Sequence, residues 1–275
     1  MRGVSFVDRL VSIATQLWLP VLLLVIWWLV TRNSTSFYFP PLTSVLATLW
    51  HDIVNGSLPQ YTLISMGNLF AGLIIAIVLG IALGLIIGEK ETLRRVSAPV
   101  LNFLRAVPPA SIVPIIIIAL GVGRAPKIFI VALGCFWPIL LNTIDGVRGT
   151  SPSIRETVRA YRIPPLMVLW RVALPAATPQ IMAGARIAFS VSLVLMVISE
   201  FFGADSGLGF YITNASNAFD SKRMWAGTLL VGILGYILSA LFLAAERRIL
   251  SWYFQDARHG RGAGNAAAAL EGAAP

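Results

Sequence analysis

Residues 151–165 read SPSIRETVRAYRIPP and separate two apolar stretches of membrane length. This segment is the longest polar break in the hydrophobic part of the chain. Ser153 and Glu156 have the spacing of a capping box, in which each side chain closes a free backbone N–H at the start of a helix. Ser151 as the cap, with Pro152 in the first turn, is an alternative start. Either arrangement predicts a short helix between the two apolar stretches.

The predicted helix has two faces of different character. Its apolar face carries Ile154, Val158 and Tyr161 at helical spacing, and its basic face carries Arg155, Arg159 and Arg162. Pro164 and Pro165 end the helix, because a proline ring removes a backbone donor and clashes with the preceding turn. On this pattern alone, a solvated loop with the usual excess of arginine and a docking element for a soluble partner are both open.

The composition is that of a membrane protein. The 275 residues are 57% hydrophobic and 12% charged, whereas soluble domains carry about 25% charged residues. The net charge of +9 comes from small basic groups scattered between apolar spans, so nucleic-acid binding is not expected. The single cysteine, Cys135, and the two histidines, His51 and His259, lie far apart, and we expect neither a disulfide nor a metal site.

Six segments are apolar and long enough, or nearly so, to cross a bilayer, which takes about 20 residues. They lie at about 10–30, 63–88, 100–120, 128–144, 181–202 and 225–245. The third is irregular, because Pro108, Pro109 and Pro114 interrupt it, and its uninterrupted apolar part, Ile112–Leu120, is too short to cross alone. We therefore expect an all-α polytopic membrane protein with about six transmembrane helices.

Lysine and arginine in the short connections predict the orientation. If the N-terminus lies inside, the outer connections hold only Arg32, Arg124, Lys127, Lys222 and Arg223, and the inner segments hold most of the others. Cytoplasmic loops carry this excess, so both termini and residues 151–175 are expected in the cytoplasm. The expected parts are a cytoplasmic N-terminus at 1–9, a transmembrane domain at 10–250 and a cytoplasmic tail at 251–275. The tail is rich in alanine and glycine and is expected to be disordered.

Several small or polar residues inside the predicted spans have candidate roles. Gly80, Gly84 and Gly88 repeat at four-residue spacing and predict close packing of another helix. The polar candidates for the pore or its gate are Asn142, Thr143, Ser190 and Glu200. Each could equally form hydrogen bonds between helices. For Glu200 we favour a structural role, such as capping residues 207–209, because its charge would repel an anion.

The sequence from Glu156 to Pro175 resembles the EAA loop of ABC-importer permeases. Glu156 matches the acidic residue, and Leu174–Pro175 matches the closing pair, nineteen positions after the acid. Thr157 and Val158 stand where two alanines are usual, and Arg162 stands where glycine permits a bend between two short helices. We expect the paired prolines to make that bend here. In that family, the loop forms a coupling helix that docks into a groove on the ATPase.

Four further strings resemble the nitrate, sulfonate and taurine branch of this family. They are FPPLTSV at 39–45, RAVPPA at 105–110, FWPILLNT at 136–143 and SGLGF at 206–210. The resemblance covers about Phe39 to Tyr253. It implies a type I ABC importer permease fold in a bacterial cytoplasmic membrane and import of a small anionic or zwitterionic solute, such as an aliphatic sulfonate, taurine or nitrate. A permease for a thiamine-precursor pyrimidine is an alternative, and so is a secondary transporter or channel not driven by ATP.

The resemblance also implies partners. A second permease copy, most simply an identical one, completes the path, two ATPase subunits hold ATP–Mg, and an extracytoplasmic binding protein delivers the solute. The chain has no Gly-x-x-x-x-Gly-Lys-Ser/Thr loop, so we expect a transport subunit that binds no cofactor of its own. Besides these proteins, we expect only membrane lipid as a partner. The expected ATPase-coupling residues are Ile154, Arg155, Glu156, Val158, Arg159, Tyr161, Arg162, Leu174 and Pro175.

Overall fold

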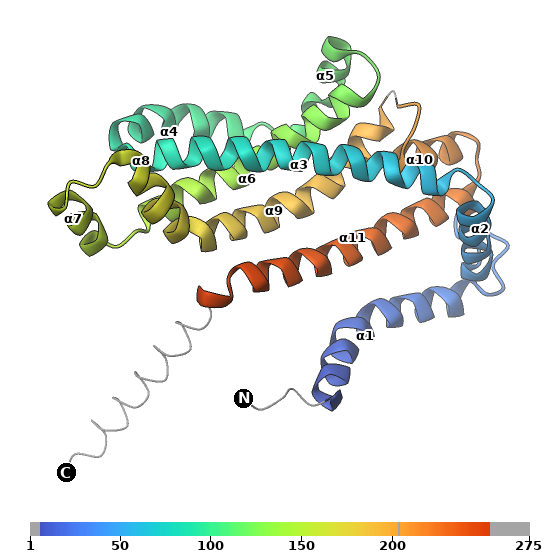
Figure 1. Cartoon of the computed structure of the whole chain (residues 1–275). Helices are drawn as coiled ribbons and strands as arrows, with labels where there is room; N and C mark the ends of the chain where they lie inside the picture. Colours follow the sequence, from blue (N-terminus) through green and yellow to red (C-terminus); the bar gives the residue numbers. More distant parts are fainter. Residues whose placement is uncertain (1–5, 203, 254–275) are drawn as a thin grey trace. The chain divides into compact units, whose positions relative to one another are not determined.

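The computed structural model describes the backbone of residues 6–202 and 204–253, and the side chains from Trp18 onward (Figure 1). All regular secondary structure in this part of the chain is helical, so the predicted all-α class is confirmed. The long helices are α1 (Phe6–Thr31), α3 (Leu58–Glu89), α6 (Arg124–Arg148), α9 (Leu174–Phe201) and α11 (Ser221–Ile249). The shorter ones are α2 (Leu42–Val54), α4 (Glu91–Ala106), α5 (Val113–Leu120), α7 (Pro152–Ala160), α8 (Pro165–Val168) and α10 (Leu208–Asn217). A 3₁₀ turn covers Pro109–Ile112, and a π-helical turn covers Leu169–Ala173.

Among the described residues, four helical stretches are long and apolar enough to cross a bilayer: α3, α6, α11 and Pro165–Phe201, which ends in α9. They correspond to the predicted spans at 63–88, 128–144, 225–245 and 181–202. The predicted span at 10–30 falls within α1, of which Trp18–Thr31 is a shorter apolar helix. A sixth span therefore stays a prediction.

The predicted span at 100–120 is a broken pair of helices. The first member, α4, begins at Glu91, nine residues before the predicted start, and meets the Pro109–Leu120 segment at a bend of 74°. Val107 and Pro108 separate the two. Pro108 and Pro109 lack the backbone N–H that would continue the helix, which explains the break at this point.

The chain forms two compact units, which we describe separately. The first comprises the residues up to Leu63 together with Ser206–Gly232. The second comprises Ile64–Asp205 and the residues from Ile233 onward. Helices α3 and α11 contribute residues to both units.

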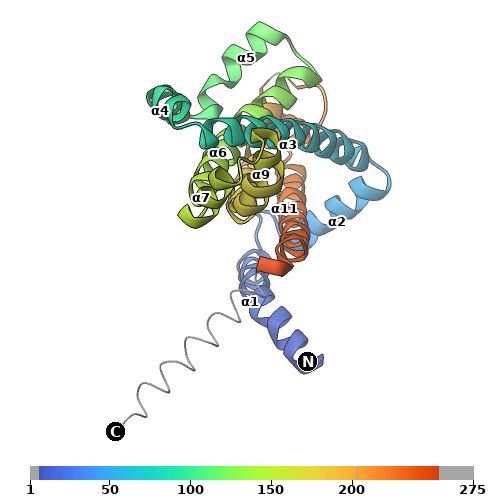
Figure 2. The same ribbon diagram turned by 60° about the vertical axis from the view of Figure 1, so that its left-hand side comes forward.

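In the second unit, α3, α6 and α9 lie side by side (Figures 1 and 2). The glycines at positions 80, 84 and 88 place bare backbone of α3 against side chains of α6. A Cβ added at each glycine would lie 2.8 Å from Ile139 at Gly80, 2.5 Å from Thr143 at Gly84 and 2.8 Å from Val147 at Gly88. Real Cβ atoms do not approach so closely, so the distance between these two helices depends on the absence of side chains.

A second side of α6, about 100° around the helix from the first, packs just as closely against α9. A Cβ at Gly184 of α9 would lie 2.6 Å from the carbonyl oxygen of Pro138, and one at Gly146 of α6 would lie 2.9 Å from Gln180. Cys135 is fully buried in this core, and its thiol lies 3.2 Å from the carbonyl oxygen of Ala188. Helix α6 is thus held on two sides.

In the first unit, α2 buries Leu42, Val45 and Leu49. The Trp225 ring of α11 lies 5.0 Å from the Trp27 ring, and its indole N–H donates to the carbonyl of Tyr38 at 2.9 Å. Neither α2 nor α10 was predicted, because both are shorter than the apolar segments of membrane length on which the prediction of helices was based.

Replacing Gly84 with alanine should destabilise the protein by about 1–3 kcal/mol, because the new methyl group overlaps Thr143. This loss exceeds the gain of at most about 1 kcal/mol in helix propensity. Gly232→Ala is the matched control, since a Cβ there meets nothing within 4 Å. It should leave stability unchanged or slightly raised. Thermal unfolding of the purified protein measures both, and an unchanged melting temperature for Gly84→Ala would contradict the close packing.

Candidate functional site

Helix α7, in the predicted coupling loop, starts at the alternative cap. Ser151 precedes the helix, and its hydroxyl oxygen accepts a hydrogen bond from the backbone N–H of Ile154 at 3.3 Å. Pro152 occupies the first helical position. The predicted capping box is wrong, because Ser153 already lies inside the helix, where its carbonyl accepts the Thr157 hydroxyl at 2.9 Å. Pro152 needs no N–H partner at this position, which favours the earlier start.

Helix α7 ends in a left-handed residue that is not glycine. Arg162 has a φ of +49°. Its N–H donates to the carbonyl of Arg159 at 3.1 Å, and the N–H of Ile163 donates to that of Val158 at 3.2 Å. These two bonds define a Schellman motif. The expectation that the prolines make the bend is therefore wrong: Arg162 takes the conformation of the missing glycine, and Pro164 and Pro165 start α8.

One arginine fixes α7 to the end of α6. The guanidinium of Arg155 donates to the carbonyl of Val147 at 2.7 Å. Val147 is also the α6 residue that contacts Gly88 of α3. The coupling loop is thus attached to the seam between α3 and α6 by a hydrogen bond to a fully buried residue.

Large apolar side chains are exposed on α7 and around α8. They are Ile154, Tyr161, Leu166, Met167 and Trp170, and we call them the loop surface; Tyr161 is 79% and Trp170 59% exposed. Val158 is half-buried and lines a small cleft with Ile154, Val168 and Val172. Leu166, Met167 and Trp170 were not predicted, because the predicted docking face was limited to the first helix of the loop. Their large apolar side chains in a polar loop are the signal that could have identified them.

The remaining predicted coupling residues lie around this surface. Glu156, Arg159 and Pro175 are exposed, and Leu174 is half-buried at the start of α9. Within the described part of the chain, no ion pair joins Glu156 to Arg159.

The four pore or gate candidates have different environments. Thr143 is fully buried against α3, and Asn142 is half-buried against Gly184, so both contribute to helix packing. Glu200 is 1% exposed and accepts the Ser65 hydroxyl at 2.8 Å. Ser190 is exposed, and its hydroxyl lies 3.3 Å from the carbonyl of Arg186. Of the four side chains, only that of Ser190 faces outward in this structure.

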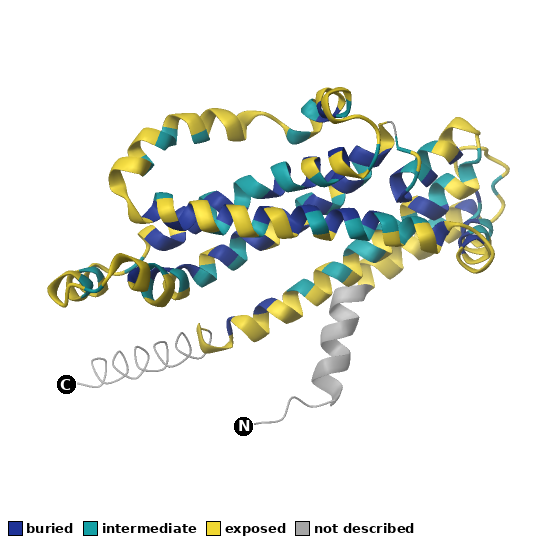
Figure 3. Ribbon diagram, turned by 45° about the horizontal axis from the view of Figure 1, so that its top comes forward, coloured by how far each residue is buried: buried dark blue, intermediate teal, exposed yellow. Residues whose placement is uncertain are grey.

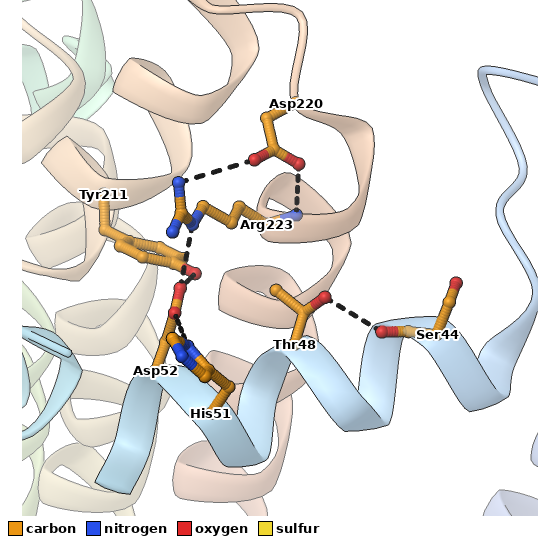
Figure 4. A network of polar contacts seen from close by, with 7 residues as sticks. All are labelled: Ser44, Thr48, His51, Asp52, Tyr211, Asp220 and Arg223. Carbon is orange, nitrogen blue, oxygen red and sulfur yellow. Dashed lines mark hydrogen bonds and ion pairs between the residues drawn. The ribbon is translucent and has the colours of Figure 1, made fainter. Parts of the chain in front are cut away.

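A polar cluster that the sequence did not reveal joins three helices of the first unit (Figure 4). Asp52 of α2 is 4% exposed and accepts the Tyr211 hydroxyl of α10 at 2.7 Å. It also accepts Arg223 Nε of α11 at 3.0 Å and lies 3.0 Å from His51 Nδ1. Figure 4 shows Arg223 between Asp52 and Asp220, to which it is also paired. A cleft beside the cluster is lined by Tyr61, Phe210 and Asn214, among others.

The cluster determines the protonation of Asp52. Burial alone would raise the pKa of this carboxyl, but hydrogen bonds from His51, Tyr211 and Arg223, with the charge of Arg223, hold its pKa below the ordinary value. Burial and the hydrogen bond to Asp52 raise the pKa of Tyr211. Asp52 is therefore ionised and Tyr211 neutral near pH 7.

Comparison with known protein families decides the identity of the chain. The family of the binding-protein-dependent transport system inner membrane component matches residues 76–251, which include α7, α8 and the seam between α3 and α6. The chain belongs to this family. It is a multi-pass membrane permease of a transport system.

Individual relatives narrow the branch. The permease is 27% identical to a putative aliphatic sulfonates transport permease, SsuC of Bacillus subtilis, over 85% of this chain and 86% of that protein. It is 30% identical to the nitrate import permease NrtB of Leptolyngbya laminosa over 66% of each chain. With a taurine transport permease also among its relatives, the permease lies in the predicted sulfonate, taurine and nitrate branch of ABC importers.

A solved structure supports the fold. A chain of the MetNI methionine ABC transporter, in an inward-facing conformation, superposes with a TM-score of 0.58 at 20% identity. The match covers 68% of this chain and 92% of that chain. The predicted type I ABC importer permease fold is therefore confirmed.

Replacing Arg162 with glycine should stabilise the end of α7 by about 1–2 kcal/mol, because a side chain in the left-handed conformation costs about that much. Arg159→Gly is the control, since it removes the same side chain from a helical position and should cost about 1 kcal/mol. Hydrogen exchange at the amides of Arg162 and Ile163 measures the effect. Faster exchange in Arg162→Gly would contradict the Schellman motif.

Replacing Tyr211 with phenylalanine should destabilise the permease by about 1.5–3 kcal/mol near pH 7, the usual contribution of a hydrogen bond to a charged group.

Because the folded pKa of Asp52 is lowered, its ionised form stabilises the fold above its unfolded pKa of about 3.9, and this contribution is lost as the pH falls through the folded pKa. The melting-temperature deficit of an Asp52→Asn variant should therefore shrink below about pH 4. A deficit independent of pH would contradict the ionised state of Asp52.

Proposed function

We propose that the permease forms the transmembrane path for a small anionic or zwitterionic solute of the aliphatic sulfonate, taurine or nitrate type, and that residues 151–175 couple this path to a separate ATPase. The loop surface is the observation that supports the coupling: large apolar side chains are exposed on a segment whose backbone is fixed at both ends of α7. The printed names of the relatives support the solute class.

The apolar side chains should dominate docking. Burying one side chain of this size is worth about 1.5–3 kcal/mol, whereas an ion pair at a rim is worth about 0–1 kcal/mol. Tyr161 and Trp170 are the largest members of the loop surface and the best candidates for anchors, since aromatic residues dominate interface energies. Glu156 and Arg159 are exposed and suit rim contacts. Arg155 serves instead as an internal brace, because its guanidinium is bonded to Val147.

The assembly that this requires has several chains. Two permease copies form the path, two ATPase subunits hold ATP–Mg, and an extracytoplasmic binding protein delivers the solute. The excess of lysine and arginine in the predicted inner segments supports a cytoplasmic location for both termini and for the loop. Closure of the ATPase dimer would draw the two α7 helices together, and the bond between Arg155 and Val147 would transmit this movement to α6.

The double variant Tyr161→Ala, Trp170→Ala should lose the ATPase, because truncating two exposed anchors weakens docking by about a hundredfold or more. The measurement is the amount of ATPase recovered with tagged permease from membranes. Tyr38→Ala is the matched control, since Tyr38 is 74% exposed and lies outside the loop. Full recovery of the ATPase with the double variant would overturn the coupling proposal.

The same assembly in lipid tests the solute. Binding protein loaded with methanesulfonate, taurine or nitrate is added in turn, and ATP hydrolysis should rise with one of them. If only a thiamine-precursor pyrimidine stimulates hydrolysis, the solute class is wrong and the coupling proposal is unaffected.

A further inference from the structure

Helix α4 presents two exposed faces of opposite character. None of its residues is buried, and Figure 3 shows it exposed along most of its length. At 3.6 residues per turn, Glu91, Arg95, Asn102 and Arg105 share one face, all exposed. Val96, Val100 and Phe103 share a nearly opposite face and are 71%, 56% and 72% exposed. The half-buried positions Arg94, Ser97 and Leu101 lie between the two faces and mark the side turned toward the unit, and the half-buried Ala98 lies within the polar face.

The charges on the polar face are unevenly compensated. Arg94 and Arg95 both pair with Glu91. Within the described part of the chain, Arg105 has no carboxylate within ion-pair distance. Asn102 lies one turn before it on the same face. The C-terminal half of α4 therefore carries a cation without a partner, beside an amide.

Arg105 also lies at the break of the span. Helix α4 is about 24 Å long, and neither it nor the shorter segment after the 74° bend can cross a hydrocarbon core of about 30 Å alone. Taken together as one broken span, the pair places the break at Val107 and Pro108 at membrane depth. Irregular backbone at that depth persists only where it is buried in protein or lines water. Val107 and Pro108 are exposed on this chain, so either water or the second permease copy covers them. The polar face that ends beside them favours water.

We propose that the C-terminal part of the polar face of α4, Asn102 and Arg105, lines the aqueous path and binds the anionic group of the solute as it passes. The apolar face then contacts lipid or a neighbouring helix, where a charge would be unfavourable. This inference rests on the proposed solute class. Thr143 and Glu200, two of the predicted pore residues, are enclosed and cannot line a path in this structure. The polar face of α4 supplies the polar lining that they do not.

The side chains suit an oxyanion. A guanidinium offers paired donors that match two oxygens of a sulfonate or nitrate group, and the Asn102 amide supplies further donors. A single unpaired cation binds an anion without trapping it, which suits a site that must also release the ion. Glu200, in contrast, would repel the solute and is held by Ser65.

Thiol labelling tests the geometry without depending on transport. In a Cys135→Ala background of the reconstituted transporter, cysteines are introduced at Asn102 and Arg105 on the polar face and at Val100 and Phe103 on the apolar face. The reagent is a membrane-impermeant, anionic methanethiosulfonate. The polar pair should react several-fold faster than the apolar pair, and turnover with solute-loaded binding protein should slow that reaction. Equal rates on the two faces would overturn the proposal.

Uptake into proteoliposomes tests the role of the charge. Arg105→Gln should lower uptake of nitrate, methanesulfonate or taurine, whichever the wild type imports, by about tenfold to a hundredfold. ATPase recovery should stay normal, and Arg105→Lys should restore part of the uptake. Arg95→Gln is the matched control, because it removes one cation from the same face where Glu91 compensates it.

The outcomes separate this proposal from the proposed function. If the wild type imports one of these anions and Arg105→Gln imports it equally fast, the role of Arg105 is refuted while the solute class stands. The cysteines at positions 102 and 105 could react fast while turnover leaves their labelling rate unchanged and Arg105→Gln leaves uptake unchanged. In that case α4 is only a surface helix, and the path proposal fails. If the wild type imports none of these anions, the solute class fails, and the anion site fails with it.

Discussion

The close contact between α3 and α6 is the constraint on which the second unit depends. Three glycines at four-residue spacing let the α6 side chains of Ile139, Thr143 and Val147 approach the α3 backbone. The last of these residues has two roles, since the side chain of Val147 packs on Gly88 and its carbonyl receives Arg155. The same residue therefore belongs to the helix seam and to the attachment of α7. A shift of α7 cannot leave this seam unaffected, because close-packed interiors transmit strain.

Two buried carboxylates, one in each unit, are compensated by cationic partners, and this distinguishes structural groups from candidate solute contacts. Asp52 has donors from α2, α10 and α11. Glu246 of α11 is 4% exposed and pairs with Arg186 of α9 through two contacts, one of 3.1 Å. An uncompensated charge in such places would be costly. Arg105 differs in being exposed and, among the described residues, in having no carboxylate within ion-pair distance, which is why it, rather than Glu200, is proposed for the path.

Hydropathy and spacing predicted the four continuous spans and the broken one, because each depends on a local run of residues. The start of α7 was harder to predict, because Ser151 and Ser153 both qualify as caps and the favourable first position of Pro152 decides between them. The left-handed Arg162 has no local signal, since arginine rarely takes that conformation. The Asp52 cluster could not be predicted from local sequence, because its hydrogen bonds join residues that are 159 and 171 positions apart.

The second unit contains a closely packed helix, α6, and a helix without buried residues, α4. This difference indicates which of the two can move at a low cost in free energy. Helix α6 is held on both sides by contacts that leave no room for a Cβ, so sliding it past α3 or α9 would create overlaps at several positions at once. Helix α4 has no buried residue to expose, and its link to α5 is a proline-containing break. Local stability follows buried apolar contacts. These contacts therefore favour a rearrangement that keeps α3, α6 and α9 together and changes the bend between α4 and α5, beside Arg105.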